Sequence, residues 1–102
     1  MVTINHEGKR PIWPEDPKFR LGRTVATSGA IAEVPMDAIY EAFARHERGD
    51  WGEMPPEDKK LNEEALEQGG RLVSKWNAQG TMFYLITEAD RSLTTALLVE
   101  EY

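Results

Sequence analysis

Residues 71–102 read RLVSKWNAQGTMFYLITEADRSLTTALLVEEY, and this stretch decides the fold. It holds three runs rich in β-branched and aromatic residues, at 71–77, 81–88 and 93–99, which are separated by short turns. The first turn, at 78–80, ends in the glycine that a hairpin loop uses in the left-handed conformation. The central run is apolar on both faces, as expected for a strand with neighbours on both sides. We therefore expect an antiparallel β meander.

Two helices are expected before the meander. The first begins at Pro35 and ends near Gly49, after a last turn rich in cations. Its apolar residues recur at the spacing of one helix face: Met36, Ile39, Tyr40 and Phe43. The second runs from about Pro55 to Gln68 and has few apolar residues. It should therefore lie on the surface with one edge buried, and Asn62 falls on its exposed side, where it should be solvated.

The predicted fold is α+β: a short N-terminal strand at 23–26, then two helices packed on one face of the antiparallel meander. A chain of 102 residues is long enough for one domain, which we place at 23–102. Residues 1–22 contain three prolines in Pro-X-X-Pro spacing and are predicted to form an extended arm. We expect Trp13 to anchor this arm to the domain.

The composition excludes several classes of protein. The chain has no cysteine, which rules out disulfides and cysteine-based zinc sites and fits a reducing cytoplasm. No apolar run approaches the roughly 20 residues that cross a bilayer. The net charge is −6; residues 1–23 carry five cations against three acids, which leaves −8 for the remaining chain. Such an acidic body disfavours direct nucleic-acid binding by the folded core.

His46 is one of two histidines, and it extends the apolar edge of the first helix. It would serve as a general base if a substrate lay within hydrogen-bond reach and its pKa were near 7. The alternative is a helix-end histidine bonded to a carbonyl or to Asp50. One histidine with carboxylates is a weak zinc signal, so neither a metal nor a cofactor is expected.

Asp50 and Trp51 lie in a tight turn between two glycines. A tryptophan in such a turn could be presented as a recognition loop, because tryptophan is enriched at binding hot spots. The alternative is that Trp51 packs back against the second helix and Asp50 caps the start of that helix.

Five polar residues cluster at one end of the meander: Glu88, Asp90, Arg91, Ser92 and Thr94. Together with Asp50 and Trp51, the first four are candidate binding residues. The plainer interpretation is a turn in which Arg91 forms salt bridges with its acidic neighbours. If His46, Arg91 and Thr94 came together beside the sheet, the layout would be similar to that of small RNases such as barnase and of RelE-type toxins.

Several motifs resemble those of a family of short uncharacterised bacterial proteins. The matching motifs include RHxxGDWG at 45–52, ITEADRSxTT at 86–95 and the ending EEY at 100–102. The resemblance covers about residues 21–102 and implies a chromosomal, plasmid or phage-island setting, in which some members carry labels such as plasmid-related or restriction-associated protein. Ser28 and Val99 stand where the family tends to have proline, which affects local turn geometry only. The family brings no established reaction.

The expected function is a small acidic binding or accessory protein of a bacterial mobile element, acting in defence or counter-defence. An inhibitor of a nucleic-acid-handling protein would fit, because an acidic surface complements a basic one. The expected partner is therefore a protein in the cytoplasm and not a membrane. The alternative is a small RNase or toxin-like enzyme that uses His46, Arg91 and Thr94, although an acidic body suits it poorly.

Overall fold

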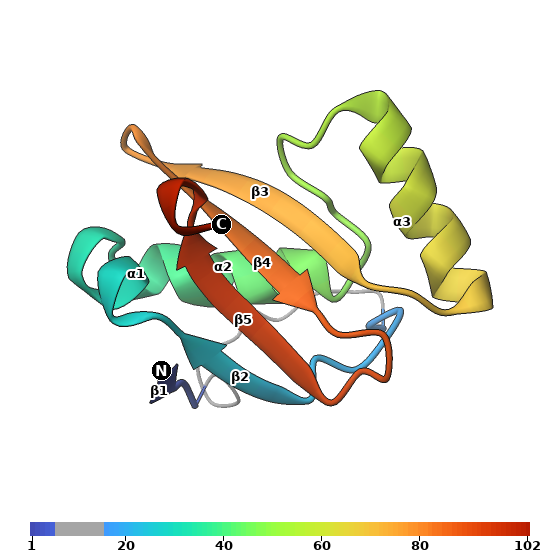
Figure 1. The fold of residues 1–102 in the computed structure, drawn as a ribbon, viewed down its shortest axis with the longest axis horizontal. Coiled ribbons are helices and arrows are strands. Elements are labelled where there is room, and N and C mark those ends of the chain that lie inside the picture. Colours follow the sequence, from blue (N-terminus) through green and yellow to red (C-terminus); the bar gives the residue numbers. More distant parts are fainter. Residues whose placement is uncertain (6–15) are drawn as a thin grey trace.

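A computed structural model describes residues 1–5 and 16–102 (Figure 1). In this part of the chain three α-helices accompany one five-stranded sheet. The elements are β1 Val2–Thr3, β2 Arg23–Ala26, α1 Ser28–Glu33, α2 Met36–His46, α3 Pro56–Gln68, β3 Leu72–Ala78, β4 Thr81–Thr87, β5 Leu93–Leu98 and the 3-10 turn η2 Val99–Glu101.

The sheet is mixed, with strand order β1-β2-β5-β4-β3. The predicted meander is present, because β3, β4 and β5 pair as successive antiparallel neighbours. The two-helix layout is only partly matched, since β2, whose partner was not predicted, pairs in parallel with β5 and makes the sheet mixed, and α1 is a third helix. The helices between β2 and β3 bring the chain back across the sheet, so that β3 runs in the same direction as β2. Each of the two hairpins that follow reverses the chain, so β5 also runs parallel to β2.

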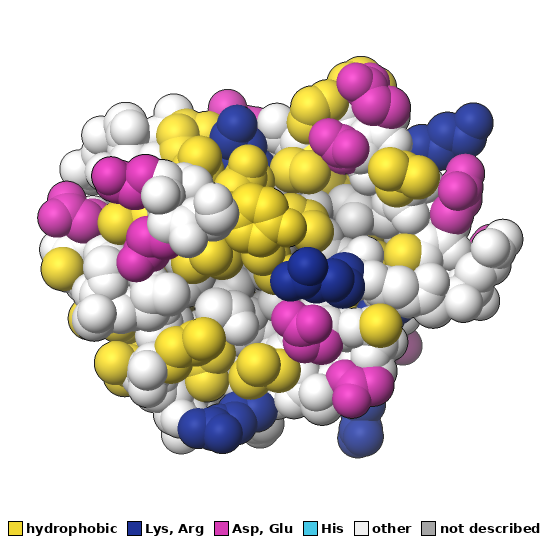
Figure 2. Space-filling model, viewed as in Figure 1, with side chains coloured by type: hydrophobic (Ala, Val, Ile, Leu, Met, Phe, Trp, Pro, Cys, Tyr) yellow, Lys and Arg dark blue, Asp and Glu magenta, His cyan; other side chains and the backbone are white. Residues whose placement is uncertain are grey.

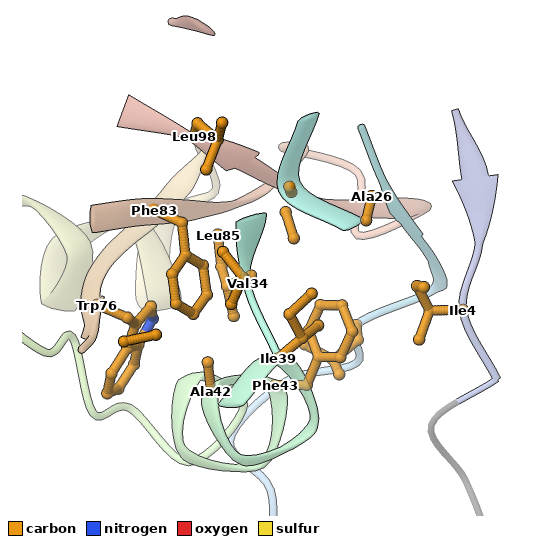
Figure 3. Packing of buried hydrophobic residues seen from close by; sticks show 14 residues of the cluster. Ile4, Ala26, Val34, Ile39, Ala42, Phe43, Trp76, Phe83, Leu85 and Leu98 are labelled. Atoms are coloured by element: carbon orange, nitrogen blue, oxygen red, sulfur yellow. The ribbon is translucent and has the colours of Figure 1, made fainter. Parts of the chain in front are cut away.

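α2 runs along one face of the sheet and supplies the centre of the core (Figure 1). Its predicted apolar stripe is confirmed: Ile39 and Phe43 are fully buried, while Met36 and Tyr40 are partly buried and pack against the same cluster. Figure 3 shows Ile39 and Phe43 pointing from α2 toward the strands, where Leu85 lies. The 3.6-residue period of the sequence is therefore the cause of this packing.

Each meander strand alternates between this core face and the opposite face. The residues that point into the core are Leu72, Ser74, Trp76, Ala78, Phe83, Leu85, Thr87, Thr94, Ala96 and Leu98. Three of these core positions carry hydroxyl groups, which must find partners inside the protein. In the described part of the chain no α-helix lies over the opposite face, and only the short η2 reaches it at one end (Figure 1).

The described parts of residues 1–22 contact the sheet. β1 pairs with β2 at the sheet edge, and Ile4 is buried in the core cluster. Leu21 is buried as well, and Phe19 packs against the same cluster. The expected anchor Trp13 lies outside the described residues, so the division into an arm and a domain stays a prediction.

Candidate functional site

His46, the last residue of α2, lies inside the protein with no exposed surface. Phe19 and Trp51 pack edge-on against its ring, with centroid distances of 5.3 and 5.6 Å. The imidazole is therefore enclosed by aromatic rings and by the core face of the sheet.

A chain of hydrogen bonds runs through this imidazole from one side of the core to the other. Nδ1 of His46 lies 2.6 Å from Oγ of Ser74, and Nε2 lies 2.8 Å from Oγ1 of Thr87. Thr87 and Thr94 are joined through their hydroxyl oxygens, 2.7 Å apart. At the far ends, the indole of Trp76 donates to Ser74, and Thr94 donates to the carbonyl oxygen of Leu21, each over 2.7 Å.

The two ends of this chain fix the direction of every proton. The carbonyl of Leu21 can only accept, so Thr94 donates to it and accepts from Thr87. Thr87 then accepts from Nε2–H of His46, and Nδ1 is left to accept from Ser74, whose oxygen accepts the indole proton of Trp76. This series of hydrogen bonds thus requires a neutral imidazole that is protonated at Nε2.

Burial, reinforced by the positive charge of Arg91, lowers the pKa of His46 from 6.5 to about 3. A second proton, at Nδ1, would also leave the Ser74 hydroxyl hydrogen without its acceptor. The ring therefore stays neutral at physiological pH. A general base must reach its substrate, and a ring that is buried with both nitrogens bonded has no such access.

Arg91 and Thr94 do not join His46 in an open site. Thr94 is buried and meets the imidazole only through Thr87. Arg91 instead binds backbone carbonyls, donating to Ala65 at 3.0 Å and to Gly70 at 2.5 Å. Its guanidinium therefore ties the C-terminal end of α3 to the turn between β4 and β5.

The acids of the turn between β4 and β5 pair with residues other than Arg91, which was their expected partner. Glu88 pairs with Arg71 at 3.6 Å, and Asp90 accepts hydrogen bonds from the backbone and the hydroxyl of Ser92. The hydroxyl of Ser92 and, second, its backbone N–H lower the pKa of Asp90. Arg91 adopts a left-handed backbone conformation, φ 62°, which is rare for a residue with a side chain. The hydrogen bonds from its guanidinium to backbone carbonyls, including that of Glu88, stabilise this conformation.

The turn at 49–52 does not present its indole. Trp51 is buried and donates from Nε1 to Glu63 of α3 at 2.7 Å, which matches the interpretation that it packs against the second predicted helix. Asp50 pairs with Arg45 and accepts from the N–H of Gly52, so it does not cap that helix. Gly52 has φ +65°, and a Cβ there would lie 2.1 Å from the carbonyl oxygen of Lys75, so only glycine fits.

α3 lies beside the outer edge of β3, and its polar residue Asn62 makes the contact. The Asn62 amide donates to the carbonyl of Val73 at 2.8 Å and accepts from the N–H of Val73 at 3.1 Å. Sequence position suggested an exposed, solvated Asn62; instead its side chain is buried and satisfies an open strand edge. Next along that edge, Lys75 is paired by the backbone of Trp51 and Glu53.

α3 itself is acidic, with five acids against two lysines. Four of those acids are exposed: Glu57, Glu63, Glu64 and Glu67. Its apolar contribution is small, since Leu61 is 60% exposed and Ala65 and Leu66 are only partly buried. Polar contacts through Asn62, Glu63 and the Ala65 carbonyl therefore hold most of this helix in place.

Sequence reasoning did not single out Ser74 or Thr87, and it assigned Asn62 to solvent. A signal for the two hydroxyls was present, because both fall on the core-facing positions of their strands, between Leu72 and Trp76 in β3 and after Leu85 in β4. A buried hydroxyl needs a partner, and a histidine on the facing helix stripe can supply one.

Comparisons with protein-family models, curated proteins and solved structures found no match for this chain. Within residues 1–5 and 16–102, no helix has the length and apolar character to cross a membrane. The same residues contain no group of three or more His, Asp or Glu side chains placed to hold a metal ion.

Proposed function

We propose that this chain is a small acidic binding protein that presents α3 to a basic protein surface. We further propose that it serves a bacterial mobile element in the cytoplasm, as an accessory of defence or counter-defence. The mobile-element setting is supported by the motif resemblance alone, and the binding role by the charge and placement of α3.

The observation that carries the binding role is the way α3 is held. A helix with so little buried apolar surface gains little from packing, yet three separate polar ties fix it to the sheet, to Trp51 and to Arg91. These ties leave its acids on the outside. A fixed row of negative charge steers association with a positive surface and favours basic partners.

The small-RNase alternative gains no support from the geometry. Its candidate base, His46, is buried and bonded on both nitrogens, and Arg91 is occupied by carbonyl oxygens. Pure wild-type protein is therefore expected to leave RNA and DNA intact. Cleavage that copurifies with the folded protein would overturn the binding proposal.

The test compares two triple charge reversals of equal size. In the first, Glu57, Glu64 and Glu67 on α3 become lysine; all three are exposed. In the matched control, three exposed acids on the other helices become lysine: Glu33, Asp37 and Glu41. Both change the net charge by the same amount, so only the location differs. Tagged proteins capture partners from bacterial lysate, and the association rate of the captured partner is then measured at several salt concentrations.

The α3 variant is expected to associate about tenfold more slowly than wild type, while the control keeps most of the rate. Association of the wild type should weaken as salt rises, because the Debye length falls. Equal loss in both variants would mean that total charge matters and that α3 is not the binding surface. Unchanged binding in the α3 variant would exclude the proposal as well.

A further inference from the structure

The face of the sheet opposite α2 is mostly apolar, which is unusual for a face without an α-helix over it (Figure 1). Strand alternation and register assign its members in β2, β3, β4 and β5, which we call the open face: the apolar Val25, Val73, Met82, Tyr84, Ile86, Leu93 and Leu97, and the polar Arg23, Lys75, Asn77 and Thr95. Figure 2 shows hydrophobic side chains gathered over the middle of this face. Most of these side chains are partly exposed, so the face offers water a contiguous apolar surface.

Aromatic and cationic side chains complete the middle of the open face. Tyr102 packs against Tyr84 with ring centroids 5.5 Å apart, and it is still 71% exposed. Lys75 also extends over Tyr84, with its ammonium 6.0 Å from the ring centroid. Exposed tyrosine with neighbouring aliphatic groups is typical of the centre of a protein interface.

Charge is distributed unevenly along the open face. The five strands of the described chain contain two charged residues, Arg23 and Lys75, and both are cations. Arg23 stands at the start of β2. Glu101 lies at the other end of that strand, where it accepts a hydrogen bond from Thr27 at 2.7 Å, and the neighbouring Glu100 is exposed. One side of the open face thus runs from a positive end to a negative end.

We propose that the open face binds a second copy of this chain, face to face about a two-fold axis that lies in the interface and crosses the strands. This rotation reverses the strand direction and places the Arg23 end of each copy over the Glu100 end of the other. The apolar middle then meets its own counterpart, as in the two stacked sheets of a sandwich.

The other two-fold axis in the interface, parallel to the strands, gains less from charge. It would keep the strand direction and exchange the two sides of the sheet, so that Arg23 of one copy faced the start of β3, where Arg71 is already paired with Glu88. This ion pair offers Arg23 no net opposite charge, whereas the axis that crosses the strands offers it Glu100. Charge complementarity therefore supports a second copy as the occupant and favours the axis that crosses the strands.

The test is sedimentation and light scattering of the pure full-length chain over a wide concentration series. The wild type is expected to approach twice 11.6 kDa as concentration rises. Leu97→Lys, in the middle of the open face, should weaken association by about tenfold or more. The control is Leu61→Lys on α3, which makes the same substitution at an exposed leucine outside the open face and should leave association unchanged.

A charge swap tests the orientation with exposed residues, whose substitution leaves the core intact. Arg23→Glu and Glu100→Arg should each weaken association by about tenfold, and the double variant should restore most of it. A wild type that stays monomeric throughout the series overturns the proposal and leaves the open face for a different partner. A double variant weaker than either single variant would overturn the orientation, and equal effects of the two leucine variants would overturn the surface.

Discussion

The side-chain amide of Asn62 pairs with the backbone of Val73 through two hydrogen bonds, and so takes the place of a neighbouring strand at the edge of β3. An open strand edge is a site for unwanted pairing with other chains. This contact closes part of the edge and at the same time fixes the middle of α3. One buried amide therefore serves both solubility and the placement of the acidic helix.

Asn62→Ala is expected to lower the free energy of unfolding by about 1–3 kcal/mol, because it removes two hydrogen bonds and leaves the partly buried backbone groups of Val73 without these partners. Urea unfolding measures the change, and hydrogen exchange at the Val73 amide should become faster. The control is Gln68→Ala, an exposed amide at the end of α3, for which a change within about 0.5 kcal/mol is expected. Equal stability of the two variants would contradict this role for Asn62.

Thr87→Val tests the buried hydrogen-bond chain with almost no change in side-chain volume. The variant leaves Nε2–H of His46 without an acceptor, so a loss of about 1–3 kcal/mol is expected. Thr95→Val is the matched control, since it makes the same change on the open face of the neighbouring strand and removes no hydrogen bond of the His46 chain. Similar small effects in both variants would show that the hydrogen bonds through His46 contribute little to stability.

The depressed pKa of His46 makes stability depend on pH. Between about 6.5 and 3 the unfolded chain binds a proton at His46 that the folded protein does not bind. Stability is therefore full above pH 6.5 and falls as the pH drops through this window, by about 1.4 kcal/mol per pH unit. Urea unfolding at pH 7.5, 6.5 and 5.5 measures the slope.

Two histidine variants identify the source of that slope. His6→Gln removes the other histidine and should keep the slope. His46→Leu should be less stable at pH 7.5 and should lose the slope between pH 6.5 and 5.5. If His46→Leu kept the wild-type slope, protons bound elsewhere would be responsible.

The sequence predicted those parts of the fold whose signals are local. The hairpin at 78–80 has Gln79 and Gly80 in the left-handed region, as the glycine there indicated, and the α2 stripe faces the core. The parallel pairing of β2 with β5 joins segments about 70 residues apart. No short motif specifies such a partner, because every strand edge offers the same backbone groups.

In the candidate site, too, local contacts could be predicted from the sequence and long-range contacts could not. The indole of Trp51 packs against α3, which was one of two interpretations open from the turn sequence. The hydroxyl partners of His46 come from two strands that are 28 and 41 residues away, so the environment that fixes its pKa depends on tertiary packing. For Asn62, helix position alone suggested solvent, since the edge of β3 comes to lie there only in the folded protein.

The central claim is that His46 is a structural residue and not a catalytic base. The most direct measurement is the nitrogen NMR of the His46 ring in the folded protein between pH 7.5 and 5. We expect Nε2 to carry the proton and Nδ1 to remain unprotonated throughout, with no titration in this range. A ring that titrates near pH 6.5, or that carries its proton on Nδ1, would contradict the account.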